Sequence, residues 1–279
     1  MLRSVDFSDF TAVEHFSQTQ LFKNHKGKFN FSLDKPTVIL GKNGQGKSSL
    51  MQALAMRFLT WYFSQSAFDD SYVDSWKGDA LWKEKGYSWE REYIFMPGMV
   101  CDTDNAPAMF FRPGHIPGNE HDVTTSMMLG YGESAKAYGR ATDKKSSGEQ
   151  GQALLEHIMK VLDGAPHDTL RFLNWSYDKT PVDPSNRGYT DNSFFRAEQL
   201  KKMFLGAEKG VPLILLDEPE QSLDAFAEMD FWSKVLKADY SKVQVIAATH
   251  SLYPLMHPER FNIIETTPGF VKAVREKML

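Results

Sequence analysis

The feature that most constrains this chain is a glycine-rich segment, Gly41-Lys-Asn-Gly-Gln-Gly-Lys-Ser48, which matches the pattern G-x-x-x-x-G-K-[S/T]. Before it, Pro36–Leu40 is a short β-branched run typical of a buried strand. After it, Ser48–Phe58 has the Ala, Leu and Met content of a buried helix. Glycines let the backbone curl so that successive N–H groups point at one anion. The segment therefore predicts a phosphate-binding loop between a strand and a helix.

Each position of this loop has an expected role. Lys47 would reach the β- and γ-phosphates of a nucleotide, Ser48 would ligate Mg²⁺, and the helix N-terminus adds a favourable field. By chance the pattern would arise in roughly 1% of chains of this length, so it indicates nucleotide binding. The predicted binding residues are Gly41, Lys42, Asn43, Gly44, Gln45, Gly46, Lys47, Ser48 and Ser49.

A second pattern is a strand of four aliphatic residues that ends in two acids, Leu213-Ile-Leu-Leu-Asp217-Glu218. Parallel sheets bind ligands at the carboxyl ends of their strands. Asp217 is expected to hold the Mg²⁺ shell opposite Ser48, and Glu218 to polarise the attacking water as general base. Without the phosphate loop, the same pattern would also fit a buried strand that runs into a solvated loop.

Three further motifs follow the loop at a distance. Ser147-Gly148-Glu149-Gln150 precedes an amphipathic pattern, Ser222-Leu-Asp224 follows Glu218 closely, and His250 ends the strand pattern Val243–Thr249. Each has an ordinary structural explanation by itself: a helix cap, an acid in a loop, and a histidine with a backbone partner. Their order along the chain is what makes them informative.

In that order, the motifs resemble those of the ABC ATPase superfamily. The resemblance covers most of the chain, and no N-K-x-D guanine motif is present. It implies ATP and Mg²⁺ as cofactors, with ATP sandwiched between two protomers. One protomer's signature residues, Ser147, Gly148, Glu149 and Gln150, would contact the nucleotide on its partner's loop. Asp224 would cross the interface, and His250 would read the γ-phosphate as a catalytic residue with Glu218 and Lys47.

Several departures favour the compact soluble branch that includes SMC, RecF and OLD-type ATPases over a transporter subunit. The signature reads S-S-G-E-Q, Asp-Glu-Pro is followed by Glu220, and 60 residues separate Gln150 from Val211. The 98 residues between Ser48 and Ser147 show no sustained heptads, which argues against a long coiled coil.

For two roles that the resemblance implies, coordination of metal and water and stacking on adenine, the sequence offers several candidate residues and no single one. No glutamine occurs between Gln65 and Gln150, where the family places a residue that coordinates metal and water. The candidates to replace it are His115, Asn119 and His121. The aromatic residues that could stack on adenine are Phe10, Phe16 and Phe22.

The predicted fold class is α/β, a P-loop NTPase of ABC ATPase type with a mainly parallel core sheet, an antiparallel β part and helical insertions. The 279 residues would form a single domain with insertions at about 64–145, an arm region, and 163–210, a surface for partner docking. The expected strands are Glu90–Met96, Ala108–Arg112, Pro212–Leu216, Val243–Ala248, Asn262–Glu265 and Phe270–Val274, and the other expected helices are Gln152–Leu162, Phe194–Glu208 and Ser222–Lys237.

Composition restricts the cellular compartment and the kinds of partner that we expect for this chain. A single cysteine, Cys101, excludes an internal disulfide, and the most apolar run, Val211–Leu216, is far shorter than a membrane span, so we expect a cytoplasmic protein without membrane insertion. The net charge of −4 argues against nucleic acid as the partner, although a local basic patch leaves DNA contact open.

The main functional hypothesis is therefore an ATP-hydrolysing switch that dimerises around Mg-ATP and works a separate effector protein, as in DNA repair or anti-phage defence. Two alternatives stay open. One is the nucleotide-binding subunit of an ABC transporter. The other is an ATP sensor with little turnover, which the missing glutamine makes credible.

Overall fold

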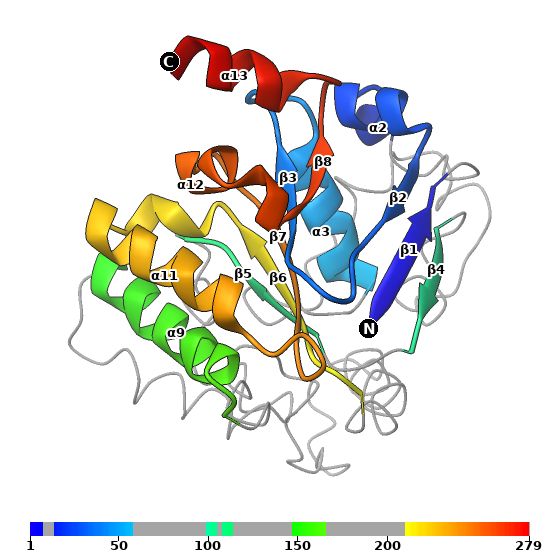
Figure 1. Ribbon diagram of the computed structural model, residues 1–279. Coiled ribbons are helices and arrows are strands. Elements are labelled where there is room, and N and C mark those ends of the chain that lie inside the picture. Colours follow the sequence, from blue (N-terminus) through cyan, green and yellow to red (C-terminus); the bar gives the residue numbers. More distant parts are fainter. Residues whose placement is uncertain (8–13, 58–98, 105–107, 114–146, 166–209, 279) are drawn as a thin grey trace, which may run out of the picture.

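The computed structural model describes residues 1–7, 14–57, 99–104, 108–113, 147–165 and 210–278 (Figure 1). Its strands are β1 (Leu2–Asp6), β2 (Lys28–Asn30), β3 (Thr37–Leu40), β4 (Val100–Thr103), β5 (Ala108–Phe111), β6 (Leu213–Asp217), β7 (Gln244–Ala248) and β8 (Asn262–Glu265). Its helices are α1 (Glu14–Ser17), α2 (Gln20–His25), α3 (Lys47–Arg57), α9 (Ser147–Leu162), α11 (Ala225–Lys237), α12 (Leu252–Met256) and α13 (Phe270–Met278), with short 3₁₀ turns η5 (Pro219–Ser222) and η6 (Pro258–Arg260).

A five-stranded parallel sheet forms the centre of the molecule, with the order β5-β6-β7-β3-β8. Its strands are nearly all apolar because both faces are covered. On β6, Leu213 and Leu215 belong to the same apolar cluster as residues of α3, whereas Ile214 and Leu216 belong to the cluster that includes residues of α9 and α11. Figure 1 shows these helices beside the sheet. The chain is therefore an α/β protein with a mainly parallel sheet, as the sequence predicts.

A smaller antiparallel sheet, β2-β1-β4, packs into the same cluster of buried residues as α3. Alternation in β2 buries Phe29 between two exposed neighbours, and its ring lies edge-on to Phe7. The side chain of Gln244, on β7, joins this sheet to the core. It accepts a hydrogen bond from the backbone N of Leu2 and donates one to the Leu2 carbonyl, each at 2.7 Å.

The prediction of a strand at Phe270–Val274 is wrong, because these residues begin α13. Phe270, Val271 and Val274 lie at helical spacing and pack against the apolar cluster beside α12. The carboxylate of Glu265 accepts hydrogen bonds from two backbone N–H groups at the start of the helix, which helps to nucleate it. A short run rich in Val and Phe fits a strand by composition, but this packing and cap select a helix.

The other expected elements in the described residues are present with small shifts. The predicted helix at Gln152–Leu162 begins five residues earlier, at Ser147, and the one at Ser222–Lys237 begins at Ala225, after the 3₁₀ turn η5. The expected strand Glu90–Met96 and helix Phe194–Glu208 lie outside the described residues.

Two strands come from the segment 64–145, which the sequence treats as an insertion. β4 pairs with β1, and β5 pairs in parallel with β6, so residues 108–111 are part of the core sheet. Residues 64–98, 105–107 and 114–145 of that segment and most of 163–210 lie outside the described residues. In the part of the chain that is described, no helix has the length and apolar content to cross a membrane.

Candidate functional site

The glycine-rich loop connects β3 to α3, as its sequence predicts. Gly44 and Gly46 have positive φ angles of 71° and 101°, conformations that other L-residues rarely adopt. A Cβ at Gly46 would also lie 2.5 Å from Thr19 Oγ1, and one at Gly41 would lie 1.6 Å from Thr266 Oγ1. The glycines are therefore required both by backbone conformation and by close packing around the loop.

The side chain of Lys47 folds back over this loop. Its Nζ donates hydrogen bonds to the carbonyls of Gly41 at 3.0 Å and Lys42 at 3.1 Å. Burial lowers the pKa of Lys47, and the carboxylates of Glu218, Asp217 and Glu220 oppose that shift. The ammonium group is thus held over the loop by two backbone oxygens, next to the loop's N–H groups.

Asp217 ends β6 fully buried, directly beside the start of α3. Ser48 Oγ donates a hydrogen bond to Asp217 Oδ1 at 3.0 Å, whereas Oδ2 has no hydrogen-bond partner among the described residues. Arg112 Nε lies 3.7 Å from Oδ2. Burial raises the pKa of Asp217 to about 6, although Arg112 and Ser48 both counteract the rise.

Ser48 and Asp217 fit a magnesium site. A hydroxyl and a buried carboxylate with one oxygen unused are the hard oxygen donors that Mg²⁺ prefers, and Mg²⁺ usually takes only one or two carboxylates besides phosphates and waters. Among the described residues, those of this site included, no group of three or more His, Cys, Asp or Glu side chains is arranged to hold a metal ion, so the protein supplies few ligands of its own here.

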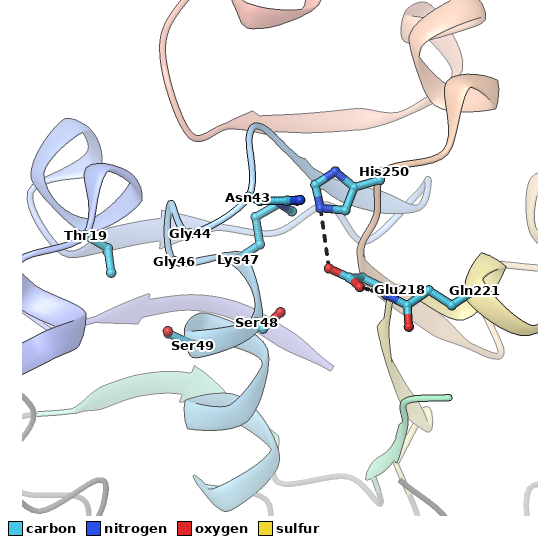
Figure 2. Close-up of a pocket in the computed structure, with 10 residues that line it drawn as sticks. All are labelled: Thr19, Asn43, Gly44, Gly46, Lys47, Ser48, Ser49, Glu218, Gln221 and His250. Atoms are coloured by element: carbon cyan, nitrogen blue, oxygen red, sulfur yellow. Dashed lines mark hydrogen bonds and ion pairs between the residues drawn. The ribbon is translucent and has the colours of Figure 1, made fainter. Parts of the chain in front are cut away.

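Glu218 and His250 face each other across the ends of β6 and β7 (Figure 2). His250 Nε2 lies 3.4 Å from Glu218 Oε1, and Gln221 Nε2 donates a hydrogen bond to Glu218 Oε2. Glu218 has a left-handed backbone with φ of 51°, and its N–H donates to the Ala248 carbonyl at 2.8 Å. Burial is the largest cause of the lowered pKa of His250.

Lys47, Ser48, Glu218 and His250 line one cavity of about 480 Å³, and Asp217 lies behind Ser48. Figure 2 shows Glu218, Gln221 and His250 on one side and, on the other, Thr19 with the loop and helix residues Asn43, Gly44, Gly46, Lys47, Ser48 and Ser49. The cavity therefore combines backbone N–H groups and a lysine with a carboxylate and a histidine. Such a site can hold a multiply charged anion and place a base beside it.

The predicted signature residues and Asp224 do not line this cavity. Residues 147–150 form the first turn of α9, where Glu149 is exposed. Asp224 is the N-cap of α11 and accepts hydrogen bonds at 2.9 Å from the N–H groups of Phe226 and Ala227. The structure thus brings together the loop, Asp217, Glu218 and His250, and leaves these two motifs apart.

Within the loop, Gln45 stabilises the turn and does not line the cavity. Its Oε1 accepts a hydrogen bond from the backbone N of Lys42 at 3.0 Å and one from Thr266 Oγ1. Of the adenine-stacking candidates, Phe16 is fully buried in the core and Phe22 packs against it. Phe10 and the three candidates for the missing glutamine lie outside the described residues.

Four residues at or near the cavity are assigned no role there by the sequence motifs: Thr19, Arg112, Glu220 and Gln221. Glu220 Oε1 accepts a hydrogen bond from the backbone N of His250 at 2.7 Å, and burial raises the pKa of Glu220. Its position after Asp-Glu-Pro was the only signal in the sequence. Thr19 and Arg112 belong to no sequence motif, and only tertiary packing brings them to the site.

The chain was compared with models of protein families, with curated proteins and with solved structures, and none of them matches it. What the protein does must therefore be inferred from the arrangement of its own residues.

Proposed function

We propose that the protein is an ATPase of the ABC type, of the compact soluble branch, which binds Mg-ATP at the loop 41–48. One observation carries the proposal: Lys47, Ser48, Glu218 and His250 line one cavity beside the ends of the neighbouring parallel strands β3, β7 and β6, and Ser48 donates a hydrogen bond to Asp217 behind it. A glycine-rich turn alone is common in proteins, whereas this set of groups in this arrangement matches the needs of phosphoryl transfer.

The loop would hold the triphosphate through its backbone N–H groups, with the Lys47 ammonium beside the terminal phosphates. Ser48 and Asp217 would hold Mg²⁺, which when bound neutralises charge on the phosphate oxygens. Glu218 would accept a proton from the attacking water. His250, whose Nε2 lies 3.4 Å from Glu218 Oε1, would orient the Glu218 carboxylate.

The substitution Glu218→Gln tests this assignment. We expect the variant to bind ATP as the wild type does and to lose a factor of about 10²–10⁴ in kcat, because general-base catalysis typically contributes that much. Phosphate release measures turnover, and a fluorescent ATP analogue measures binding. Glu259→Gln, an exposed position on η6, is the matched control. Normal hydrolysis by Glu218→Gln would show that the base is another group.

The site also supports assembly of two copies around ATP. The signature residues on α9 and the Asp224 turn lie away from the cavity of their own chain, and both Glu149 and Asp224 are exposed. Supplied by a second protomer, they would complete each site. We infer that Mg-ATP closes a homodimer that acts on a separate effector protein, and that Glu218→Gln accumulates this dimer in size-exclusion chromatography with ATP.

A second candidate, an ATP sensor with little turnover, is favoured by the contacts of Glu218. Its two carboxylate oxygens face His250 and Gln221, respectively, so that an attacking water molecule would share each oxygen with one of these side chains. A sensor would bind Mg-ATP and dimerise but show steady-state phosphate release near background. Turnover that rises with ATP and saturates would exclude it.

A further inference from the structure

Arg112 enters the candidate site from a strand that carries no recognised motif. It directly follows β5, which pairs in parallel with β6 so that Phe111 lies opposite Leu216. The next residues, Arg112 and Asp217, therefore come out at the same edge of the sheet. The Arg112 side chain is 38% exposed, whereas that of Asp217 is fully buried.

The two oxygens of Asp217 differ in what they contact. Oδ1 accepts the hydrogen bond from Ser48, while Oδ2 lies 3.7 Å from Arg112 Nε and has no hydrogen-bond partner among the described residues. A distance of 3.7 Å is too long for a hydrogen bond. Arg112 therefore acts on this carboxylate through its charge and leaves an oxygen lone pair available to a second cation.

We propose that Arg112 is a positioning residue that makes the site select a metal–nucleotide complex over a bare divalent cation. The inference rests on the proposed function, since it concerns how Mg²⁺ and ATP share the site. A bare cation at Asp217 would meet two positive groups, Arg112 and Lys47, both of which lie close enough to influence the charge of Asp217. Mg-ATP carries a net charge of about −2, so Arg112 and Lys47 attract this complex, whereas they repel the bare cation.

The positive charge of an arginine does not depend on its surroundings. A guanidinium group is charged in any protein environment, because its charge is delocalised over three nitrogens. Arg112 is thus a permanent positive charge next to the metal-binding carboxylate. It would couple the two ligands, so that each binds more tightly when the other is present.

The test uses the full-length protein with Mn²⁺ as the probe. Electron paramagnetic resonance measures the Kd of free Mn²⁺, first alone and then with a non-hydrolysable ATP analogue. The main variant is Arg112→Met, which removes the charge without adding an oxygen ligand. Arg275→Met, on the exposed side of α13, is the control, and circular dichroism checks that each variant is folded.

For Arg112→Met we expect bare Mn²⁺ to bind about 5- to 10-fold more tightly than in the wild type, and the preference for the Mn-nucleotide complex to fall by at least that factor. Arg112→Lys keeps the charge and should bind bare Mn²⁺ more weakly than the Met variant. Unchanged preference in Arg112→Met, or a Lys variant that binds bare Mn²⁺ as tightly as the Met variant, would overturn the proposal.

The two proposals fail in different ways. If the wild type binds no Mn-nucleotide complex at all, the proposed function is wrong. If the wild type binds that complex but Arg112→Met keeps the wild-type preference, only the role of Arg112 is wrong.

Discussion

Two neighbouring carboxylates, Asp217 and Glu218, have different environments because of one change in backbone direction. Asp217 is the last residue of β6, so its side chain is buried between the sheet and α3. Glu218 has a left-handed backbone, which turns its side chain toward the cavity and His250. Adjacent acids with different partners can divide the work of holding a metal and taking a proton.

The pH dependence of stability tests the burial of Asp217. Its pKa is about 6 in the folded protein against 3.8 ordinarily, so the folded state holds this proton more tightly than the unfolded chain. The resulting stabilisation is complete below about pH 4 and is lost as the pH rises through 6. The wild type should therefore lose unfolding free energy between about pH 4 and pH 6. Asp217→Asn, which can still accept a hydrogen bond from Ser48, should reduce this loss by on the order of 2 kcal/mol.

The measurement is the melting temperature of the metal-free wild type and of Asp217→Asn between pH 4 and 7.5. The variant should gain stability relative to the wild type as the pH rises across this window. Parallel profiles would mean that Asp217 titrates normally in the folded protein.

At the scale of elements, the segment after β6 is joined to the turn after β7 by two glutamates. Glu220, in η5, accepts a hydrogen bond from the His250 backbone N, and Glu228, in α11, accepts one from Ser251 Oγ. Ser251 in turn is the N-cap of α12. The position of His250 relative to Glu218 therefore depends on these contacts as well as on the pairing of β6 with β7.

Substitutions at Glu220 test this connection. Glu220→Ala removes the acceptor for the His250 N–H, and we expect a loss of about 1–3 kcal/mol in unfolding free energy. Because His250 would move while the loop 41–48 stays in place, the proposed ATPase activity should lose more in kcat than it gains in KM. Glu220→Gln keeps an acceptor and serves as the matched variant.

Urea unfolding and steady-state kinetics give the two readouts for these variants. Glu220→Gln should retain the stability and the kcat of the wild type. Equal losses in Glu220→Ala and Glu220→Gln would show that the negative charge of Glu220, and not its hydrogen bond, is what matters.

At the scale of the whole molecule, two sheets of different type share one apolar cluster, and a buried glutamine joins them. Gln244 closes a pair of hydrogen bonds with the backbone of Leu2, and its Nε2 also donates to the Ser32 carbonyl at 3.1 Å. The N-terminal strand is thereby held against β7, 242 residues away in the chain.

The substitution Gln244→Met tests how much these hydrogen bonds contribute to the free energy of unfolding. The methionine fills a similar volume but leaves the Leu2 N–H and carbonyl without their buried partner, which we expect to cost about 2–4 kcal/mol. Urea unfolding measures the loss, with Gln20→Met, an exposed position on α2, as the control. A change below about 0.5 kcal/mol, as for a surface substitution, would contradict the role of Gln244.

The sequence by itself determined the features that depend on short, contiguous patterns. The loop between β3 and α3, the apolar strand ending in Asp217 and Glu218, and the amphipathic α9 were all predictable, because periodicity and glycine content are local properties. His250 could be placed at a strand end for the same reason. These residues make up most of the candidate site.

Only the tertiary structure decided the rest. The α13 segment has the composition of a strand, yet its packing and the Glu265 cap make it a helix. Thr19 and Arg112 belong to the site because strand order and long-range packing bring them there, and no local pattern encodes strand order. Contacts between residues far apart in the chain are formed by burial of the whole core, which a short window of sequence cannot represent.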